Sequence, residues 1–267
     1  MNRRLNVTTP LGEALKFDSL VGVEAISALF DFTVTLRSEA KGLATASVLG
    51  QSMTVDFDLD GGARRALDGQ CIAFRSTGHR GDWHFYQARL RPWLWYATRR
   101  SDCRIFQNKT VPEIVKAVLG AYPFSVDWRL TRSYRSFEYN VQYRETDYNY
   151  VARLLELEGI FWYFEHGAGE HTLVLVDDLA LCTPWPGYEE ARYFDPAHMG
   201  VAGEDHLSSW SEQGAVRSGA YEAREFNFQM PRATLETAYA SPAEHPHGNY
   251  EIYDYPGAYT AIGEGDP

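Results

Sequence analysis

The hydrophobic pattern changes its period once, near residue 110, and this change restricts the fold more than any other feature of the sequence. Up to about residue 98, apolar and polar residues alternate, as in FDFTVTLRS at 30–38 and MTVDFDLD at 53–60. Alternation with a period of two is typical of strands that bury one face. Because Pro92 interrupts the last of these runs, we expect a meander of strands that closes into a barrel or a sandwich.

A helical period begins at residue 110. Thr110, followed three residues later by Glu113, forms a capping box, and Gly120 suits the C-terminal end of this helix. The run SFEYNVQYRE at 136–145 then predicts a strand that leads into a second helical segment.

The second helix is predicted over roughly 147–158, with Thr146 or Asp147 as its N-cap and Gly159 at its end. The run IFWYFEH that follows is too aromatic and too short for a further helix. The turn GAGE reverses the chain into HTLVLVDD, so we expect a hairpin. In this interpretation the acidic residues of 143–166 lie at capping and solvent positions, and the aromatic residues form core that covers the hairpin.

The order of these segments predicts an α+β, mainly β chain in which two antiparallel β-barrel-like domains flank a smaller α/β insertion. We assign 1–103 to the first barrel, completed by strands of 160–185, and 104–180 to the helical insertion with its hairpin. The second barrel is assigned to 181–267 and is expected to be truncated at its C-terminus. Strand-like alternation in this last part rests on five residues: Trp210, Val216, Tyr221, Phe226 and Phe228.

Composition and charge exclude several classes of function. The net charge of -11 would repel phosphate backbones and anionic lipids, so we expect no nucleic acid partner and no membrane insertion. No window approaches the ~18 uninterrupted apolar residues of a membrane span, and the N-terminal segment lacks the apolar run of a signal peptide. Cys71, Cys103 and Cys182 show no paired spacing, and we interpret them as buried thiols in a reducing compartment.

Histidines near acidic residues raise the question of a metal site. They occur in EHGAGEH at 165–171, in HMGVAGEDH at 198–206 and in EHPHG at 244–248. A zinc protease motif needs two histidines one helical turn apart, and Gly167 and Gly169 break that spacing in the first segment. We interpret these histidines as solvated loop residues and expect neither a metal nor a cofactor.

Carboxylates and aromatic residues together also suit glycoside hydrolysis, because aromatic rings stack on sugars. The candidate acids are Glu156, Glu158 and Glu165. No nucleophile elbow and no glycine-rich phosphate-binding motif occurs in the sequence. We therefore expect no catalytic residue, and a secreted carbohydrate-active or metal-dependent hydrolase remains the alternative.

Four segments in a fixed order carry a resemblance to a known family. They are TPLGEALKFDSLVGVEAISALFDFTVTLRSE, FQNKTVPEIVKAVL, VQYRETDYNYVARLLELEGIFWYFEH and YEIYDYPGAY. Together they resemble the N-terminal region of the VgrG spike proteins of type VI secretion systems, which is similar to the baseplate hub of contractile phage tails. The signature and packing residues are Tyr143, Arg144, Asp147, Leu154, Leu155, Gly159, Phe161, Tyr163, Phe164, Tyr253, Asp254, Tyr255, Pro256 and Gly257.

The resemblance implies a structural, non-enzymatic role. Such hubs are homotrimers with two related barrels per chain, so that a pseudo-sixfold ring meets a hexameric tube protein while the threefold axis continues into a spike extension or effector cargo. It also implies residence in the bacterial cytoplasm before firing and export without a signal peptide to the periplasm, the extracellular space or a target cell. The needle repeats of full-length members do not follow in this sequence, and a prophage tail hub is a further alternative.

Overall fold

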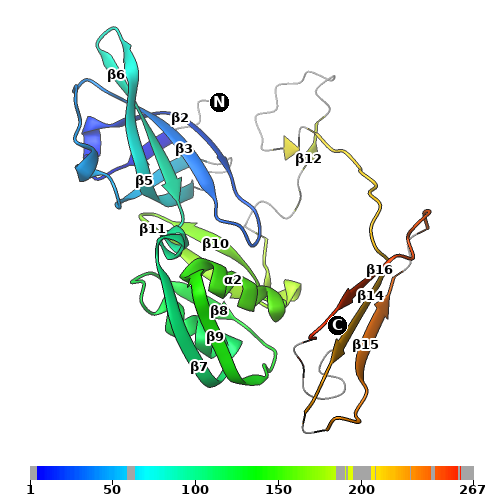
Figure 1. Ribbon diagram of the computed structural model, residues 1–267. Helices are drawn as coiled ribbons and strands as arrows, with labels where there is room; N and C mark the ends of the chain where they lie inside the picture. Colours follow the sequence, from blue (N-terminus) through cyan, green and yellow to red (C-terminus); the bar gives the residue numbers. More distant parts are fainter. Residues whose placement is uncertain are drawn as a thin grey trace. The chain divides into compact units, whose positions relative to one another are not determined.

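The computed structural model describes residues 5–58, 64–184, 190, 192–194, 206–207, 209–228, 230–241, 244–257 and 259. The chain divides into two compact units, Met1–Ala191 and Arg192–Pro267. Figure 1 shows strands predominating in both, which confirms the mainly β, α+β class expected from the sequence. In the described part of the chain, no helix is long and apolar enough to cross a membrane.

The first unit begins with a six-stranded antiparallel sheet. Its strands lie in the order β1-β4-β5-β6-β3-β2, and the edge strands β1 and β2 also contact each other, so the sheet curls. Alternation along 30–38 is confirmed, because every second residue of β3 from Phe32 onward is buried. The bounds are β1 Leu5–Thr8, β2 Lys16–Val23, β3 Asp31–Ser38, β4 Ser52–Asp58, β5 Arg64–Arg80 and β6 Trp83–Arg91.

Short 3-10 helices connect these strands. They are η1 Gly12–Ala14, η2 Thr45–Ser47 and η4 Trp93–Arg99. The break expected at Pro92 is confirmed, because β6 ends at Arg91 and η4 starts one residue after the proline. Proline cannot donate to a strand ladder, and here its extended backbone leads into a 3-10 helix that buries Trp93 and Leu94.

Two predicted helices are confirmed between residues 110 and 158. They are α1 Val111–Leu119 and α2 Asp147–Leu157. Both hydrogen bonds of the Thr110–Glu113 capping box are present. Thr146, not Asp147, caps α2, since its side chain accepts the N–H of Asn149. Gly159 follows α2 with a φ of +63°, a left-handed conformation that favours glycine.

Two small sheets accompany the helices. In the first, β7 Ser101–Thr110 pairs with β9 Ser136–Thr146 as an antiparallel ribbon. In the second, β10 Phe161–Gly167 and β11 Glu170–Val176 form the expected hairpin, and β8 Val126–Arg129 pairs in parallel with β11. A further 3-10 helix, η5, follows at Leu179–Leu181.

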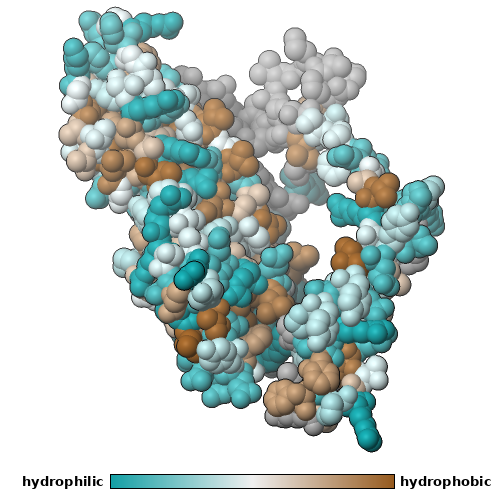
Figure 2. Space-filling model, in the orientation of Figure 1, coloured by the Kyte–Doolittle hydropathy of each residue, from teal (hydrophilic) through white to brown (hydrophobic). Residues whose placement is uncertain are grey.

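One continuous hydrophobic core joins the six-stranded sheet to the helices and the hairpin. It includes Phe30 and Leu90 from the sheet, Ile114 from α1, Leu154 from α2 and Trp162 from β10. Trp162 and Phe164 are buried, which confirms that the aromatic residues of the hairpin form core. The face of the molecule in Figure 2 accordingly shows hydrophobic residues scattered among hydrophilic ones.

The second unit is built on a three-stranded sheet in the order β15-β14-β16, in which β14 pairs in parallel with β16. Ala223, Leu235 and Tyr259 form its small described core. The other described pair is β12 with β13. The bounds are β12 Arg192–Tyr193, β13 His206–Leu207, β14 Ala220–Glu225, β15 Leu235–Ala240 and β16 Glu251–Asp254.

The strand pattern predicted for 206–230 is correct only in part. Tyr221 lies in β14, but Trp210, Val216, Phe226 and Phe228 lie outside strands and are exposed. The segment between β13 and β14 contains Gly214, Gly219 and several serines, which favour turns and offer little or no apolar surface to pack on a partner strand. Apolar alternation alone therefore overestimated the strand content here.

Candidate functional site

Buried carboxylates dominate the polar chemistry of the first unit. The side chains of Asp68, Asp147 and Asp177 have no exposed surface. A buried charge is costly unless it is paired and hydrogen-bonded, so the partners of each carboxylate show what it does.

Asp68 lies on β5 and joins β4 to the β10–β11 hairpin. Its Oδ1 accepts hydrogen bonds from the hydroxyls of Ser52 and Thr54 on β4. Its Oδ2 lies 2.8 Å from Nδ1 of His171 on β11. The carboxylate thus connects residues 103 positions apart in the sequence. Serine, aspartate and histidine are also the three residue types of a hydrolase triad.

His171 excludes that interpretation. Its Nε2 accepts the backbone N–H of Trp93 at 2.8 Å, so the proton of the neutral ring resides on Nδ1, which donates to Asp68. Burial lowers the pKa of His171, although the adjacent Asp68 favours the charged ring. Ser52 donates to the aspartate rather than to the imidazole. Both ring nitrogens are committed to the protein, whereas a general base needs one directed at a substrate or nucleophile.

His166 extends the cluster toward the loop between β2 and β3. Its Nδ1 lies 3.1 Å from the backbone nitrogen and 3.0 Å from the backbone oxygen of Asp68. Its Nε2 lies 3.0 Å from Oε1 of Glu24, and the ring packs 5.0 Å from that of Phe30. The loop is also bonded to β10 through the N–H of Ser27, which donates to the carbonyl of Trp162.

The interpretation of His166 and His171 as solvated loop histidines is therefore wrong. Both are paired strand residues directly opposite each other, and the turn occupies only the residues between Gly167 and Glu170. His166 has the same parity along β10 as the buried Trp162 and Phe164, which places it on the face toward the core. The hairpin register implied by GAGE already contained this signal. Asp68, by contrast, had no local sequence signal that set it apart.

Asp147 forms the second buried centre, at the start of α2. Arg104 on β7 and Gln142 on β9 donate to its Oδ1, the latter at 2.8 Å. The hydroxyl of Tyr122 donates to Oδ2 at 2.8 Å, and Arg100 lies 3.7 Å away. Burial and this hydrogen bond raise the pKa of Tyr122. The expectation that the acids of 143–166 lie at capping and solvent positions is thus wrong for Asp147, because partners from distant segments stabilise it in the interior.

Asp177 forms the third centre, directly after β11. Its carboxylate accepts the backbone N–H groups of Thr131 and Arg132, each at 2.8 Å, and the hydroxyl of Tyr134 at 2.8 Å. Burial alone would raise the pKa of Asp177, but these hydrogen bonds outweigh it and lower the pKa to about 2. The carboxylate therefore fixes the loop after β8 to the end of β11.

The signature residues of the first unit are divided between core and surface. Leu154, Leu155 and Phe164 are buried, whereas Phe161 and Tyr163 are half-buried. On β9, Tyr143 is 65% exposed, and Arg144 has a φ of +51° and places its guanidinium over the Tyr143 ring. These two residues form an outer surface, so packing alone does not account for their place in the signature.

The second group of signature residues lies in the other unit. Tyr253 and Asp254 end β16, and the hydroxyl of Tyr221 lies 3.4 Å from Asp254. Tyr255 is exposed, its peptide bond to Pro256 is cis, and the N–H of Gly257 donates to the carbonyl of Arg224. This segment therefore ends the third strand of the sheet and continues alongside β14, parallel to it.

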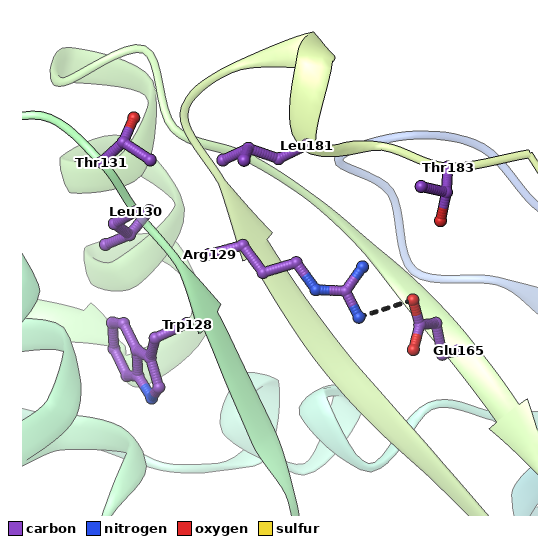
Figure 3. Close-up of a pocket in the computed structure, with 7 residues that line it drawn as sticks. All are labelled: Trp128, Arg129, Leu130, Thr131, Glu165, Leu181 and Thr183. Atoms are coloured by element: carbon purple, nitrogen blue, oxygen red, sulfur yellow. Dashed lines mark ion pairs between the residues drawn. The ribbon is translucent and has the colours of Figure 1, made fainter.

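The glutamates considered for hydrolysis are engaged differently from one another. Glu165 pairs with Arg129 across β11 at 2.8 Å, and the two side chains point toward each other in Figure 3. They line a surface hollow with Trp128, Leu130, Thr131, Leu181 and Thr183. Glu158 lies 4.0 Å from Arg135, and Glu156 is exposed. The carboxylate of Glu165 is engaged by Arg129 within the protein, which suits a structural ion pair rather than a catalytic group directed at a substrate.

Two further expectations concern cysteines and metals. Cys71 is buried, and burial raises its pKa to about 11, but Cys103 is exposed and Cys182 is half-buried, so the description as buried thiols is wrong for these two. Cys103 lies on β7, whose only strand partner among the described residues is β9. Among the described residues, no group of three or more histidine, cysteine or acidic side chains is arranged to hold a metal ion; of the segments considered for metals, 198–205 lies outside these residues.

Comparison with known proteins gives consistent matches. The type VI secretion system spike protein VgrG1a of Pseudomonas aeruginosa is 38% identical over 268 residues, which is 100% of this chain and 42% of that protein. VgrG1c of the same organism is 38% identical over 266 residues, 99% of this chain and 36% of that protein. The chain thus spans about two fifths of the length of these relatives.

Solved structures show the same fold. The E. coli c3393 protein, described as a component of the type VI secretion system with similarity to the phage T4 tail proteins gp27 and gp5, gives a TM-score of 0.57 at 27% identity, over 73% of this chain and 51% of that one. A tail protein from Neisseria meningitidis gives a TM-score of 0.64 at 12% identity, over 96% and 72%. The family model described as phage tail baseplate hub (GPD) matches residues 23–267. The chain therefore belongs to the phage tail baseplate hub family.

Proposed function

We propose that this chain is the hub of a type VI secretion spike, a trimeric adaptor between a hexameric tube and a threefold spike. The observation that carries the proposal is the alignment with a secretion spike protein over the whole chain at 38% identity. A non-enzymatic role is part of the proposal and is supported by the names of the matched relatives, which are spike proteins. A tube protein and a spike extension or effector cargo are the proposed partners.

The interior of the first unit supports a structural role. Asp68, Asp147 and Asp177 each join segments that are far apart in the sequence, and each carboxylate accepts several hydrogen bonds. Fully satisfied buried polar networks make a fold rigid and restrict it to one arrangement. An adaptor that transmits force between a tube and a spike needs this rigidity more than it needs an accessible acid.

The proposal is tested by assembly. Light scattering of the purified chain should give the mass of a trimer, and the trimer should co-sediment with assembled tube protein. Each component sedimented alone is the control for pelleting. A verified trimer that fails to bind tube protein at high micromolar concentration would contradict the adaptor role. A chain that stays monomeric would contradict trimerisation by this region alone.

A prophage tail hub is the second candidate function. It is favoured by the fold shared with the Neisseria tail protein, whereas the higher sequence identity to secretion spike proteins favours secretion. Binding distinguishes the two candidates, because the chain should prefer the tube protein of a secretion system to that of a phage tail. Preference for the tube protein of a phage tail would favour the prophage tail hub.

A further inference from the structure

The hairpin that joins β5 to β6 carries two histidines beside its turn. Gly81 and Asp82 form the turn, and Gly81 has a φ of +57°, as the first central residue of a tight hairpin turn often requires. Arg80 pairs with Trp83, and His79 is directly opposite His84. Directly opposed residues point to the same face of a ribbon, so both imidazoles lie on one side of it.

The two imidazoles lie close together, and their ring nitrogens are available to bind a ligand. Their ring centroids lie 6.0 Å apart with 42° between the ring planes. His79 is exposed and His84 half-buried, and within the described part of the chain neither ring is hydrogen-bonded. For a tetrahedral ion bound at about 2.1 Å by each nitrogen, the centroids would lie about 5 Å apart. A small rotation of the exposed His79 side chain brings the two ring centroids to this separation.

The surroundings suit a cation. Asp82 lines a surface hollow together with Trp83 and His84; Glu39 also lines it but is paired with Lys16 at 3.8 Å, so the negative charge beside His84 comes from Asp82. Of the nearby cations, Lys16 and Arg37 are placed over the ring of Trp83, at 5.0 and 4.9 Å from its centroid. Trp83 precedes His84 and therefore points to the other face of the ribbon. The hairpin tip, cyan in Figure 1, projects beyond the neighbouring strands, and His79 is exposed, so water can supply the remaining ligands.

We propose that His79 and His84 form a two-histidine site for one divalent transition-metal ion of the Zn²⁺, Ni²⁺ or Cu²⁺ class, with water completing the coordination. Imidazole nitrogen is a preferred ligand of these ions, whereas Mg²⁺ and Ca²⁺ prefer oxygen. The ion joins the two strands at their free end and restrains the tip of a long hairpin. This site is independent of the proposed hub function.

The test is a calorimetric titration of the full chain, without a histidine tag, with NiCl₂ and separately with ZnCl₂ at pH 7.5. We expect one ion per chain and affinity at least tenfold weaker for His79→Asn and for His84→Asn. The matched control is the His245→Asn/His247→Asn double variant, which removes two histidines of the second unit and should bind as the parent does. A Cys103→Ser variant, which removes the exposed thiol, should also bind normally.

Two further readouts separate a built site from surface adsorption. An excess of MgCl₂ should not compete, because Mg²⁺ prefers oxygen ligands, whereas ZnCl₂ and NiCl₂ should compete with each other for the same site. Circular dichroism of each variant establishes that it is folded. Unchanged affinity in His79→Asn and His84→Asn, loss of binding in the His245/His247 variant instead, or no saturable binding would each overturn the proposal.

Discussion

Removing the Asp147 carboxylate should destabilise the first unit more than removing any surface acid. In Asp147→Ala the fully buried Gln142 amide and the hydroxyl of Tyr122 each lose an acceptor. A buried donor left without a partner costs about 1–3 kcal/mol. The guanidinium of Arg104 loses its carboxylate too, but its side chain is 24% exposed and can reach water, so it adds less. We expect the free energy of unfolding to fall by about 3–5 kcal/mol, the range for breaking a buried ion pair.

Urea denaturation followed by circular dichroism measures this change. Asp147→Asn keeps one acceptor and the shape of the side chain, so about half of the loss is expected. Asp127→Ala is the matched control, because Asp127 is also paired with an arginine, Arg129, but its side chain is 45% exposed. Exposed pairs contribute about 1 kcal/mol or less. If Asp147→Ala and Asp127→Ala destabilise the protein equally, the carboxylate does not organise the fold as described.

The remaining predictions concern packing, acid stability and the acidic surface. Leu154→Asp should prevent folding because it buries an unpaired charge in the core, whereas Leu157→Asp, at a position 50% exposed, should leave the circular dichroism spectrum unchanged. Asp177 has a pKa of about 2, below its ordinary 3.8, so its contribution to the free energy of unfolding is complete above about pH 4 and is lost as the pH falls toward 2. In Asp177→Asn, the urea concentration at the unfolding midpoint should therefore fall less steeply between pH 4 and pH 2. The pKa of His171 is lowered, chiefly by burial, so the unfolded chain binds the proton more readily than the folded chain does. The free energy of unfolding should therefore decline as the pH falls below about 6.5. An equal decline in a His171→Gln variant would refute this. Glu165→Gln should change stability by less than about 1 kcal/mol, and loss of a measured glycoside hydrolysis in this variant would favour the hydrolase instead.

Local patterns predicted local structure well. The capping box of Thr110 and Glu113, the glycine end of α2 and the GAGE hairpin each depend on a few adjacent residues, and the structure confirms all three. The family signature also identified the correct helix and hairpin. Such features succeed because their hydrogen bonds form within one or two turns of chain.

Features that depend on distant partners were not predictable in this way. Asp68 and His171 are joined across 103 positions, and Asp147 binds residues from several separate segments, so their burial has no local pattern. The pairing of His79 with His84 depends on the hairpin register, which a bulge earlier in β5 shifts. The strand prediction for Trp210 and Phe228 failed for the opposite reason. Their apolar alternation is a local pattern, but no described strand pairs with them. The division into barrels at 103 and 180 remains a prediction.

The bond from Ser27 to Trp162 also determines when the first unit can finish folding. The N–H of Ser27 donates to the carbonyl of Trp162 at 2.7 Å, and Glu24 and Asp68 reach residues that follow on the same hairpin. Contacts of such long sequence separation form slowly, because loop closure precedes any gain from them. During synthesis the ribosome must therefore release the β10–β11 hairpin before the six-stranded sheet can bury Phe30 against it. Until then the sheet exposes an apolar face, so chaperone dependence should be greatest for nascent chains that end between β6 and β10.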